Sequence, residues 1–266
     1  MTFPPQQAAP LSSLASVASR LTSLALLSAV VGCTELGSNF DAPLPLTEHQ
    51  AVSHAESTDV DQWTSWRGGA HHGVSPSTSL PVRFSPHHQV RWKTKLNGHG
   101  HSSPIVFGDR VFLTRSFGKG HRAQLEVFAI DLNTGLELWK KGVGRPVGTT
   151  HQRNGHASAT MATDGQHLLA YFGAKGLFCF TLDGEPLWHR PYPDAVHECG
   201  AASSPLIAGG LAIQLVDSES DSFLAAYDVA TGDQRWNTHR ISDGCWTSPV
   251  VAQVDGPAVG HAALRV

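Results

Sequence analysis

The sequence lacks an excess of basic residues. Its 266 residues include 19 Lys and Arg against 22 Asp and Glu, which gives a formal net charge of −3 at pH 7. Proteins that hold nucleic acid mainly through its phosphates carry a basic stripe or patch. We therefore expect no nucleic-acid partner. Apolar residues make up 41% of the chain, close to the globular average, and this argues against wholesale disorder.

The sequence also lacks an apolar run long enough to cross a bilayer as a helix. The run Leu21–Val31 follows Arg20 and has the length of the hydrophobic part of a signal peptide. It leads into VVGC at residues 30–33, which resembles the bacterial lipobox. We interpret residues 1–32 as a lipoprotein-type signal peptide and Cys33 as the lipidation site. The protein is then exported and anchored in a membrane, facing the periplasm or the cell exterior; an ordinary secretory signal is the alternative.

The next segment has no sustained apolar period. Residues 33–60 are polar and punctuated by proline, a composition that suits a flexible tether between a lipid and a folded domain. The folded domain is expected over residues 61–266.

No part of this domain has the 3.6-residue apolar period of amphipathic helices, and this disfavours helical repeats. Instead, a Gly-x-x-x-Trp pattern recurs. Tryptophan falls at intervals of 47, 49 and 48 residues, and a glycine stands four residues before each of the last three: Trp92, Gly135 and Trp139, Gly184 and Trp188, Gly232 and Trp236. A repeat of this length is typical of a propeller or a solenoid.

A second landmark opens each unit. It reads Ser-Pro at residues 103–104, 204–205 and 248–249, and we take Ser158-Ala159 as its substitute in the remaining unit. One unit contains four short apolar runs, SSPIVFGD, RVFLTRS, LEVFAIDL and LELWKK, each bounded by turn-forming residues. Four antiparallel strands per unit make a β-propeller blade. We expect an all-β fold: a partial propeller of about three full four-stranded blades and part of a fourth, as an open arc.

The recurring tryptophans have a physical reason in such a fold. A four-stranded sheet has two apolar faces that it cannot bury alone, and a tryptophan offers roughly 150–250 Å² of surface and an indole N–H that can reach a carbonyl. We interpret the four tryptophans as residues that pack one blade against the next. The three glycines would fix the hairpin turns that hold the tryptophans in register.

The repeat resembles a known one. Two units carry Ala-x-Asp-x-x-Thr-Gly-x-x-x-Trp, from Ala129 to Trp139 and from Ala226 to Trp236, and this is similar to the pyrroloquinoline-quinone (PQQ) repeat. Over residues 63–252 the chain resembles the PQQ-like β-propeller proteins common in planctomycete-type bacteria. The resemblance implies seven or eight blades, and at about 48 residues each these need more chain than the 266 residues present. Truncation is the interpretation we favour; completion of the ring by another chain is the alternative.

The family bears on the cofactor. Its quinone-dependent dehydrogenases need PQQ with Ca²⁺, a catalytic Asp and, in the alcohol-oxidising enzymes, a disulfide between adjacent cysteines. Here Cys179, Cys199 and Cys245 are all isolated in sequence, so we expect no cofactor, with PQQ and Ca²⁺ as the alternative. Cys179 is expected in the core. Cys199 and Cys245 are predicted to be separate thiols, and a disulfide between them stays open.

Histidines precede the unit openings. His99, His101, His156 and His197 would gather at one mouth of the central channel if these segments lead into the innermost strands. They are the candidate axial binding residues, for a transition metal or an anion, although such side chains can equally be hydrogen-bonded to water and loop backbone alone.

Two functions follow from the resemblance. One is a non-catalytic propeller lipoprotein of the cell envelope that binds a protein partner as an assembly scaffold, like the lipoprotein of the outer-membrane barrel-assembly machinery. The other is a PQQ- or metal-dependent oxidoreductase, whose activity truncation could have removed. We favour the scaffold, and assign it no catalytic or metal-binding residue.

Overall fold

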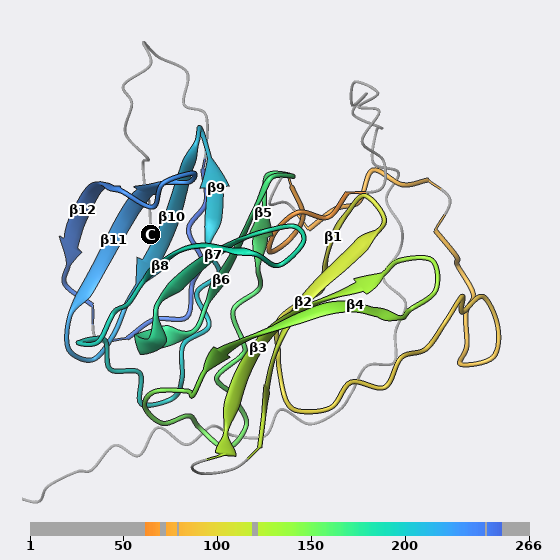
Figure 1. The fold of residues 1–266 in the computed structure, drawn as a ribbon, viewed down its shortest axis with the longest axis horizontal. Helices are drawn as coiled ribbons and strands as arrows, with labels where there is room; N and C mark the ends of the chain where they lie inside the picture. The colour runs from red at the N-terminus through yellow and green to blue at the C-terminus, as the bar shows by residue number, and fades with distance from the viewer. Residues whose placement is uncertain (1–61, 70–72, 79, 119–121, 243, 252–266) are drawn as a thin grey trace, which may run out of the picture. The chain divides into compact units, whose positions relative to one another are not determined.

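The computed structural model describes residues 62–69, 73–78, 80–118, 122–242 and 244–251, all within one compact unit, Ala55–Val266. They form three four-stranded antiparallel sheets, each built from one repeat (Figure 1). The sheets are β1 (Ile105–Phe107), β2 (Arg110–Phe117), β3 (Gln124–Asp131) and β4 (Glu137–Gly144); β5 (Ala162–Thr163), β6 (His167–Tyr171), β7 (Leu177–Thr181) and β8 (Pro186–Arg190); and β9 (Leu206–Ala208), β10 (Leu211–Val216), β11 (Ser222–Asp228) and β12 (Gln234–Arg240).

This arrangement confirms the expected all-β partial propeller with three full blades. The described residues contain no α-helix; one 3₁₀ turn, η2 (Gly173–Lys175), lies between β6 and β7. None of the described segments could cross a membrane as a helix. Residues 244–251 stand where a fourth unit would begin and contain no strand, and the rest of that unit lies outside the described residues. So do the predicted signal peptide, Cys33 and the whole of the predicted tether.

The central strands of each sheet are buried on both faces. In β11 (SFLAAYD) six consecutive residues are buried, and most residues of β6, β7 and β10 are buried as well. The fourth strand of each sheet is mostly exposed, as in β12 (QRWNTHR). Burial on both faces requires that both faces of a sheet are covered. The second sheet has a neighbouring sheet on each face, whereas Trp92 packs on the outer face of the first sheet and Trp236 on that of the third.

Two cores lie between the three sheets. One joins the first sheet to the second and includes Phe112, Leu125 and Leu168, all fully buried. The other joins the second sheet to the third and includes Tyr171 and Ala225. The sheets are therefore held together by face-to-face packing of apolar side chains, which is the principal stabilising force in such a stack.

The turns between the third and fourth strands explain the Asp-x-x-Thr-Gly motif. The Asp131 carboxylate accepts bonds from the amides of Asn133 and Thr134, at 3.0 and 2.7 Å, and from the Thr134 hydroxyl at 2.7 Å. The amide of Gly135 then donates to the Asp131 carbonyl at 2.9 Å, and the glycine has φ +74°, in the left-handed region. The turn after β11 repeats this pattern around Asp228.

A segment before the first sheet also belongs to the folded part. Trp63 exchanges two 2.8 Å backbone hydrogen bonds with Val106 of β1, and Thr64 accepts a bond from the amide of Thr163 in β5 at 2.9 Å. The segment 62–67 therefore lies along the first strands of two neighbouring sheets, and it brings residues 65–67 to the site described next.

Candidate functional site

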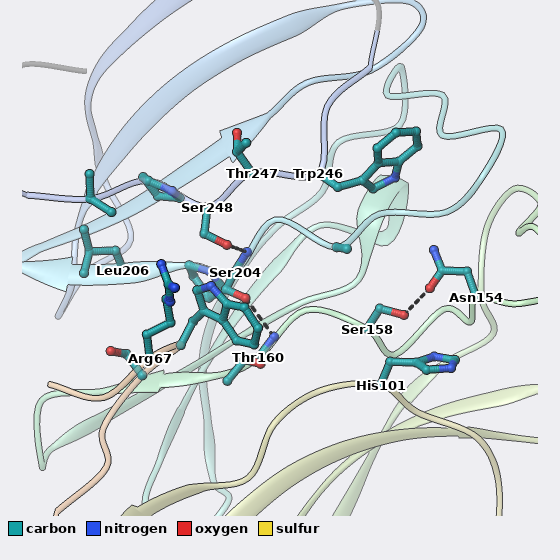
Figure 2. Close-up of a pocket in the computed structure, with 16 residues that line it drawn as sticks. Arg67, His101, Asn154, Ser158, Thr160, Ser204, Leu206, Trp246, Thr247 and Ser248 are labelled. Carbon is teal, nitrogen blue, oxygen red and sulfur yellow. Dashed lines mark hydrogen bonds between the residues drawn. The ribbon is translucent and has the colours of Figure 1, made fainter. Parts of the chain in front are cut away.

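A cavity of about 490 Å³ opens where the chain enters the first strands of the sheets. We call it the hydroxyl pocket. It is lined by residues from 65–67, 154–160, 202–206 and 246–250, together with His101. The stretches 154–160, 202–206 and 246–250 are the openings of successive repeats, so equivalent positions of the repeats face one another here (Figure 2).

A chain of hydrogen bonds links these openings. The amide of Ser103 donates to Oγ1 of Thr160 at 2.9 Å, and the amide of Thr160 donates to Oγ of Ser204 at 3.0 Å. The amide of Ser204 in turn donates to Oγ of Ser248 at 2.9 Å. Each opening thus uses a hydroxyl to satisfy the backbone N–H of the opening before it. We call this series the hydroxyl ladder; Figure 2 shows its last two bonds.

The ladder corrects the assignment of the repeat opening. Ser158-Ala159 was expected to replace Ser-Pro in the second repeat, but Thr160 occupies the position of Ser103 and Ser204. The Ser158 hydroxyl instead donates to Oδ1 of Asn154. The prediction was wrong by two residues, because serine was matched as a residue type. The shared chemistry is a hydroxyl one residue before a proline or its substitute, a signal already present in the sequence.

Arg67 brings the positive charge of the hydroxyl pocket. It lies at one end of the pocket and His101 lies at the other (Figure 2). Arg67 forms no ion pair with any described residue, and no Asp or Glu lines the pocket. Its backbone has φ +63°, in the left-handed region that side-chain-bearing residues adopt at a cost of roughly 1–2 kcal/mol. The sequence signals for a pocket residue at this position are weak, since one arginine in a loop has no distinguishing pattern.

A second cavity, of about 320 Å³, contains two histidines, and we call it the histidine pocket. His156 and His197 line it beside Phe172 and Gly173. Burial lowers the pKa of both imidazoles below the ordinary value, and for His197 the nearby Glu219 partly opposes the effect. Both rings are therefore neutral at pH 7.

The neutral His197 ring has a defined partner. Its Nε2 lies 3.0 Å from the hydroxyl of Tyr171, a side chain buried in the core between the second and third sheets. Burial raises the pKa of the Tyr171 phenol above its ordinary value, so this hydrogen bond joins two uncharged groups.

The four predicted axial histidines are divided by the structure. His101 lines the hydroxyl pocket, His156 and His197 line the histidine pocket, and His99 lines neither. The backbone of His99 pairs with Ser116 through two 2.7 Å hydrogen bonds. Within the described part of the chain, no group of three or more His, Cys, Asp or Glu side chains could hold a metal ion.

Three of the four repeat tryptophans contact the sheet that follows them in the chain. The indole N–H donates to a carbonyl in the next sheet's turn: Trp92 to Leu132 at 2.7 Å, Trp139 to Leu182 at 3.0 Å, and Trp188 to Val229 at 2.8 Å. Trp92 itself belongs to no strand.

The repeat glycines lie directly beneath these rings. A Cβ added to Gly135 would meet Trp92 at 2.6 Å, one at Gly184 would meet Trp139 at 2.7 Å, and one at Gly232 would meet Trp188. The sequence predicted these glycines from turn geometry alone. The structure adds a second requirement, because a side chain at each position would collide with the indole of the preceding repeat. Trp236, the last of the series, packs on the apolar face formed by Leu206, Ile213 and Leu224.

The three described cysteines are free thiols. Cys179 is fully buried opposite Trp188, and burial raises the pKa of its thiol to about 12. Cys199 and Cys245 are partly buried and are not joined to each other. A buried thiol with a raised pKa is a poor nucleophile, so Cys179 is inert in this position.

The donor set of the hydroxyl pocket does not fit PQQ with Ca²⁺. Calcium is bound by several oxygens, with carboxylates prominent among them. The pocket offers hydroxyls, one guanidinium, one imidazole and the amide of Asn154, whose oxygen already accepts two hydrogen bonds, and none of its lining residues is an Asp or Glu. The residues present here therefore match an anion better than a cation.

Three sheets joined by tryptophan-to-turn contacts define a PQQ-repeat β-propeller protein. The chain belongs to the PQQ-repeat family described as outer membrane protein assembly factor BamB, whose family model matches residues 123–261, just over half of the chain.

Individual relatives are distant and longer than this chain. The outer membrane protein assembly factor BamB of Burkholderia pseudomallei (strain K96243) is 27% identical over 135 residues, 50% of this chain. The polyvinylalcohol dehydrogenase of a Pseudomonas sp. is 26% identical over 199 residues, 67% of this chain. The chain spans only 29% of the length of each of these two proteins.

Solved structures resemble the chain at lower sequence identity. A europium-containing methanol dehydrogenase aligns over 68% of this chain and 32% of its own, with a TM-score of 0.49 and 14% identity. BamB from Moraxella catarrhalis aligns over 57% of this chain and 55% of its own, with a TM-score of 0.34 and 16% identity.

Proposed function

We propose that the protein is a non-catalytic scaffold of the cell envelope that binds a protein partner. Two findings support this proposal: membership of a family described as an assembly factor, and the donor set of the hydroxyl pocket. The donor set of the hydroxyl pocket is the observation that favours a scaffold over an enzyme. Quinone oxidation of an alcohol needs a Lewis acid and a base beside the reacting atoms, and the lining residues include no carboxylate for either role.

The rival function is a PQQ-dependent dehydrogenase. It is favoured by the longer of the two alignments, since the similarity to the polyvinylalcohol dehydrogenase extends over 67% of the chain. If PQQ bound in the hydroxyl pocket, Arg67 and the ladder hydroxyls would contact its carboxylates, and the cofactor would supply two-electron oxidation of a substrate. No described residue of the pocket is placed to hold its Ca²⁺.

One experiment separates the two functions. The folded protein is mixed with PQQ and Ca²⁺, passed through gel filtration, and assayed with an artificial electron acceptor and alcohols. We expect no quinone absorbance that depends on Ca²⁺ in the protein fraction, and no oxidation. Retention of PQQ with Ca²⁺ together with dye-linked alcohol oxidation would refute the scaffold and establish the enzyme.

The location of the scaffold depends on Cys33. We propose that a lipid on this cysteine anchors the protein to a membrane of the envelope, with residues 33–60 as the tether. A Cys33→Ser variant should move from the membrane to the soluble fraction, whereas the matched variant Cys199→Ser should stay with the wild type. Equal membrane association of all three would contradict lipidation at Cys33.

A further inference from the structure

The hydroxyl pocket contains hydrogen-bond donors that nothing in the described chain accepts. Thr160, Ser204 and Ser248 each receive an amide N–H on the side-chain oxygen. None of these three hydroxyls has a described acceptor for its own proton. A hydroxyl that receives one donor must direct its proton away from it. Thr160 and Ser204 are only 1% and 3% exposed, so bulk water offers these protons little compensation.

The one guanidinium in the pocket faces no opposite charge. Arg67 lines the pocket, no carboxylate does, and Arg67 has no ion pair with a described residue. Hydrogen bonds to a charged acceptor are roughly twice as strong as neutral ones. A row of hydroxyl donors beside an unpaired guanidinium is therefore complementary to an oxyanion.

The size of the pocket indicates more than an inorganic ion. Its volume, about 490 Å³, falls in the range of small-molecule sites. Two indoles line it, and both are available to a ligand, since Trp66 is 43% and Trp246 is 54% exposed. The N–H of Trp246 is already bonded to the Gly200 carbonyl at 2.9 Å, so this indole can offer a ligand only its apolar faces.

From this geometry we propose that the hydroxyl pocket binds a small molecule with a carboxylate, sulfate or phosphate group attached to a planar or apolar body. The oxyanion lies against Arg67 and the hydroxyl of Ser248, the ladder residue that is only partly buried, and the body lies against Trp66 and Trp246. The left-handed backbone of Arg67, φ +63°, is consistent with a residue held in place for binding. This site does not depend on the scaffold function proposed above.

The test is titration calorimetry on the folded protein at low ionic strength. The probes are sulfate, inorganic phosphate, benzoate, PQQ without Ca²⁺, and benzamide as the neutral counterpart of benzoate. We expect one anion class to bind saturably at a single site and to quench tryptophan fluorescence, while benzamide binds at least about tenfold more weakly. The class that binds identifies the headgroup.

Variants assign the binding to the pocket. Arg67→Gln should weaken the anion at least about tenfold, because a charge-assisted hydrogen bond is lost. Arg83→Gln removes one charge from an exposed arginine that does not line the pocket, and it should bind like the wild type. Ser248→Ala, at the last position of the ladder, should weaken binding severalfold. It provides a second measurement if Arg67→Gln fails to fold.

Three results would overturn the proposal: no saturable binding of any anion at millimolar concentration, equal binding by the wild type and Arg67→Gln, or equal binding of benzoate and benzamide. Failure of the scaffold proposal is a separate outcome. Retention of PQQ that requires Ca²⁺, with alcohol oxidation, refutes the scaffold alone. Binding of PQQ that needs Arg67 but no Ca²⁺ supports the anion site alone.

Discussion

Replacing Gly184 with alanine tests the contact between a tryptophan and the next repeat. Gly184 has φ +81°, and an added Cβ would lie 2.7 Å from Cε3 of Trp139. The left-handed backbone costs a residue with a Cβ roughly 1–2 kcal/mol. Forcing a methyl group into the packed ring adds roughly 1–3 kcal/mol. We therefore expect Gly184→Ala to lower the free energy of unfolding by about 2–5 kcal/mol.

A matched control isolates the ring contact. Gly209 has φ +56°, but an added Cβ would meet nothing within 4 Å, so Gly209→Ala carries only the backbone cost, about 1–2 kcal/mol. Denaturant unfolding followed by circular dichroism measures both. In a Trp139→Leu background, where the ring is gone, Gly184→Ala should cost no more than Gly209→Ala, and the double-mutant cycle gives the coupling. Equal costs for the two alanine variants in the wild-type background would refute the packing role of this glycine.

Two further predictions concern the hydroxyl ladder and the turns. Ser204→Ala leaves the Thr160 amide without its acceptor and should lower the unfolding free energy by about 1–3 kcal/mol, whereas Ser204→Thr keeps a hydroxyl and should cost less; equal losses would contradict the ladder. Asp228 accepts bonds from Arg235 and from the amides of Thr231 and Ala230, which lower the pKa of its carboxyl to about 2. Because this pKa is depressed in the folded state, Asp228 stabilises the fold above the unfolded value of about 3.9, and its contribution is lost as pH falls toward 2. As the pH is lowered from 4 to 2, the melting temperature should therefore fall less steeply for Asp228→Asn than for the wild type. Equal slopes for the two proteins would contradict this role of Asp228.

The sheets could be predicted from the sequence because their signals are local and repeated. Each strand is a short apolar run next to a turn residue, and a glycine with positive φ closes the last hairpin of each sheet at Gly135, Gly184 and Gly232. Because the same pattern recurs in three units at equal spacing, it predicts propeller blades far more specifically than a single hairpin would.

The site was less predictable because its geometry depends on contacts between repeats. The histidines were grouped because each precedes a repeat opening. They stand at different numbers of residues before it, however, and His101 and His197 therefore line different pockets. The ladder hydroxyls were visible as Ser-Pro pairs, but their partners lie 44 or 57 residues away in the chain. Arg67 comes from a loop before the first sheet, and the backbone bonds of Trp63 with Val106 and of Thr64 with Thr163 explain its presence at the pocket.

The tryptophan and ladder contacts between repeats run in one direction along the chain, from a donor in one repeat to an acceptor in the next. Trp139 needs the carbonyl of Leu182, Trp188 needs that of Val229, and the amide of Thr160 needs the hydroxyl of Ser204. A sheet that forms before its successor therefore keeps an indole N–H and a backbone amide without their acceptors until the next sheet packs against it. While the stack is incomplete, its growing edge, rather than its interior, exposes the apolar surface and polar groups that a chaperone could bind.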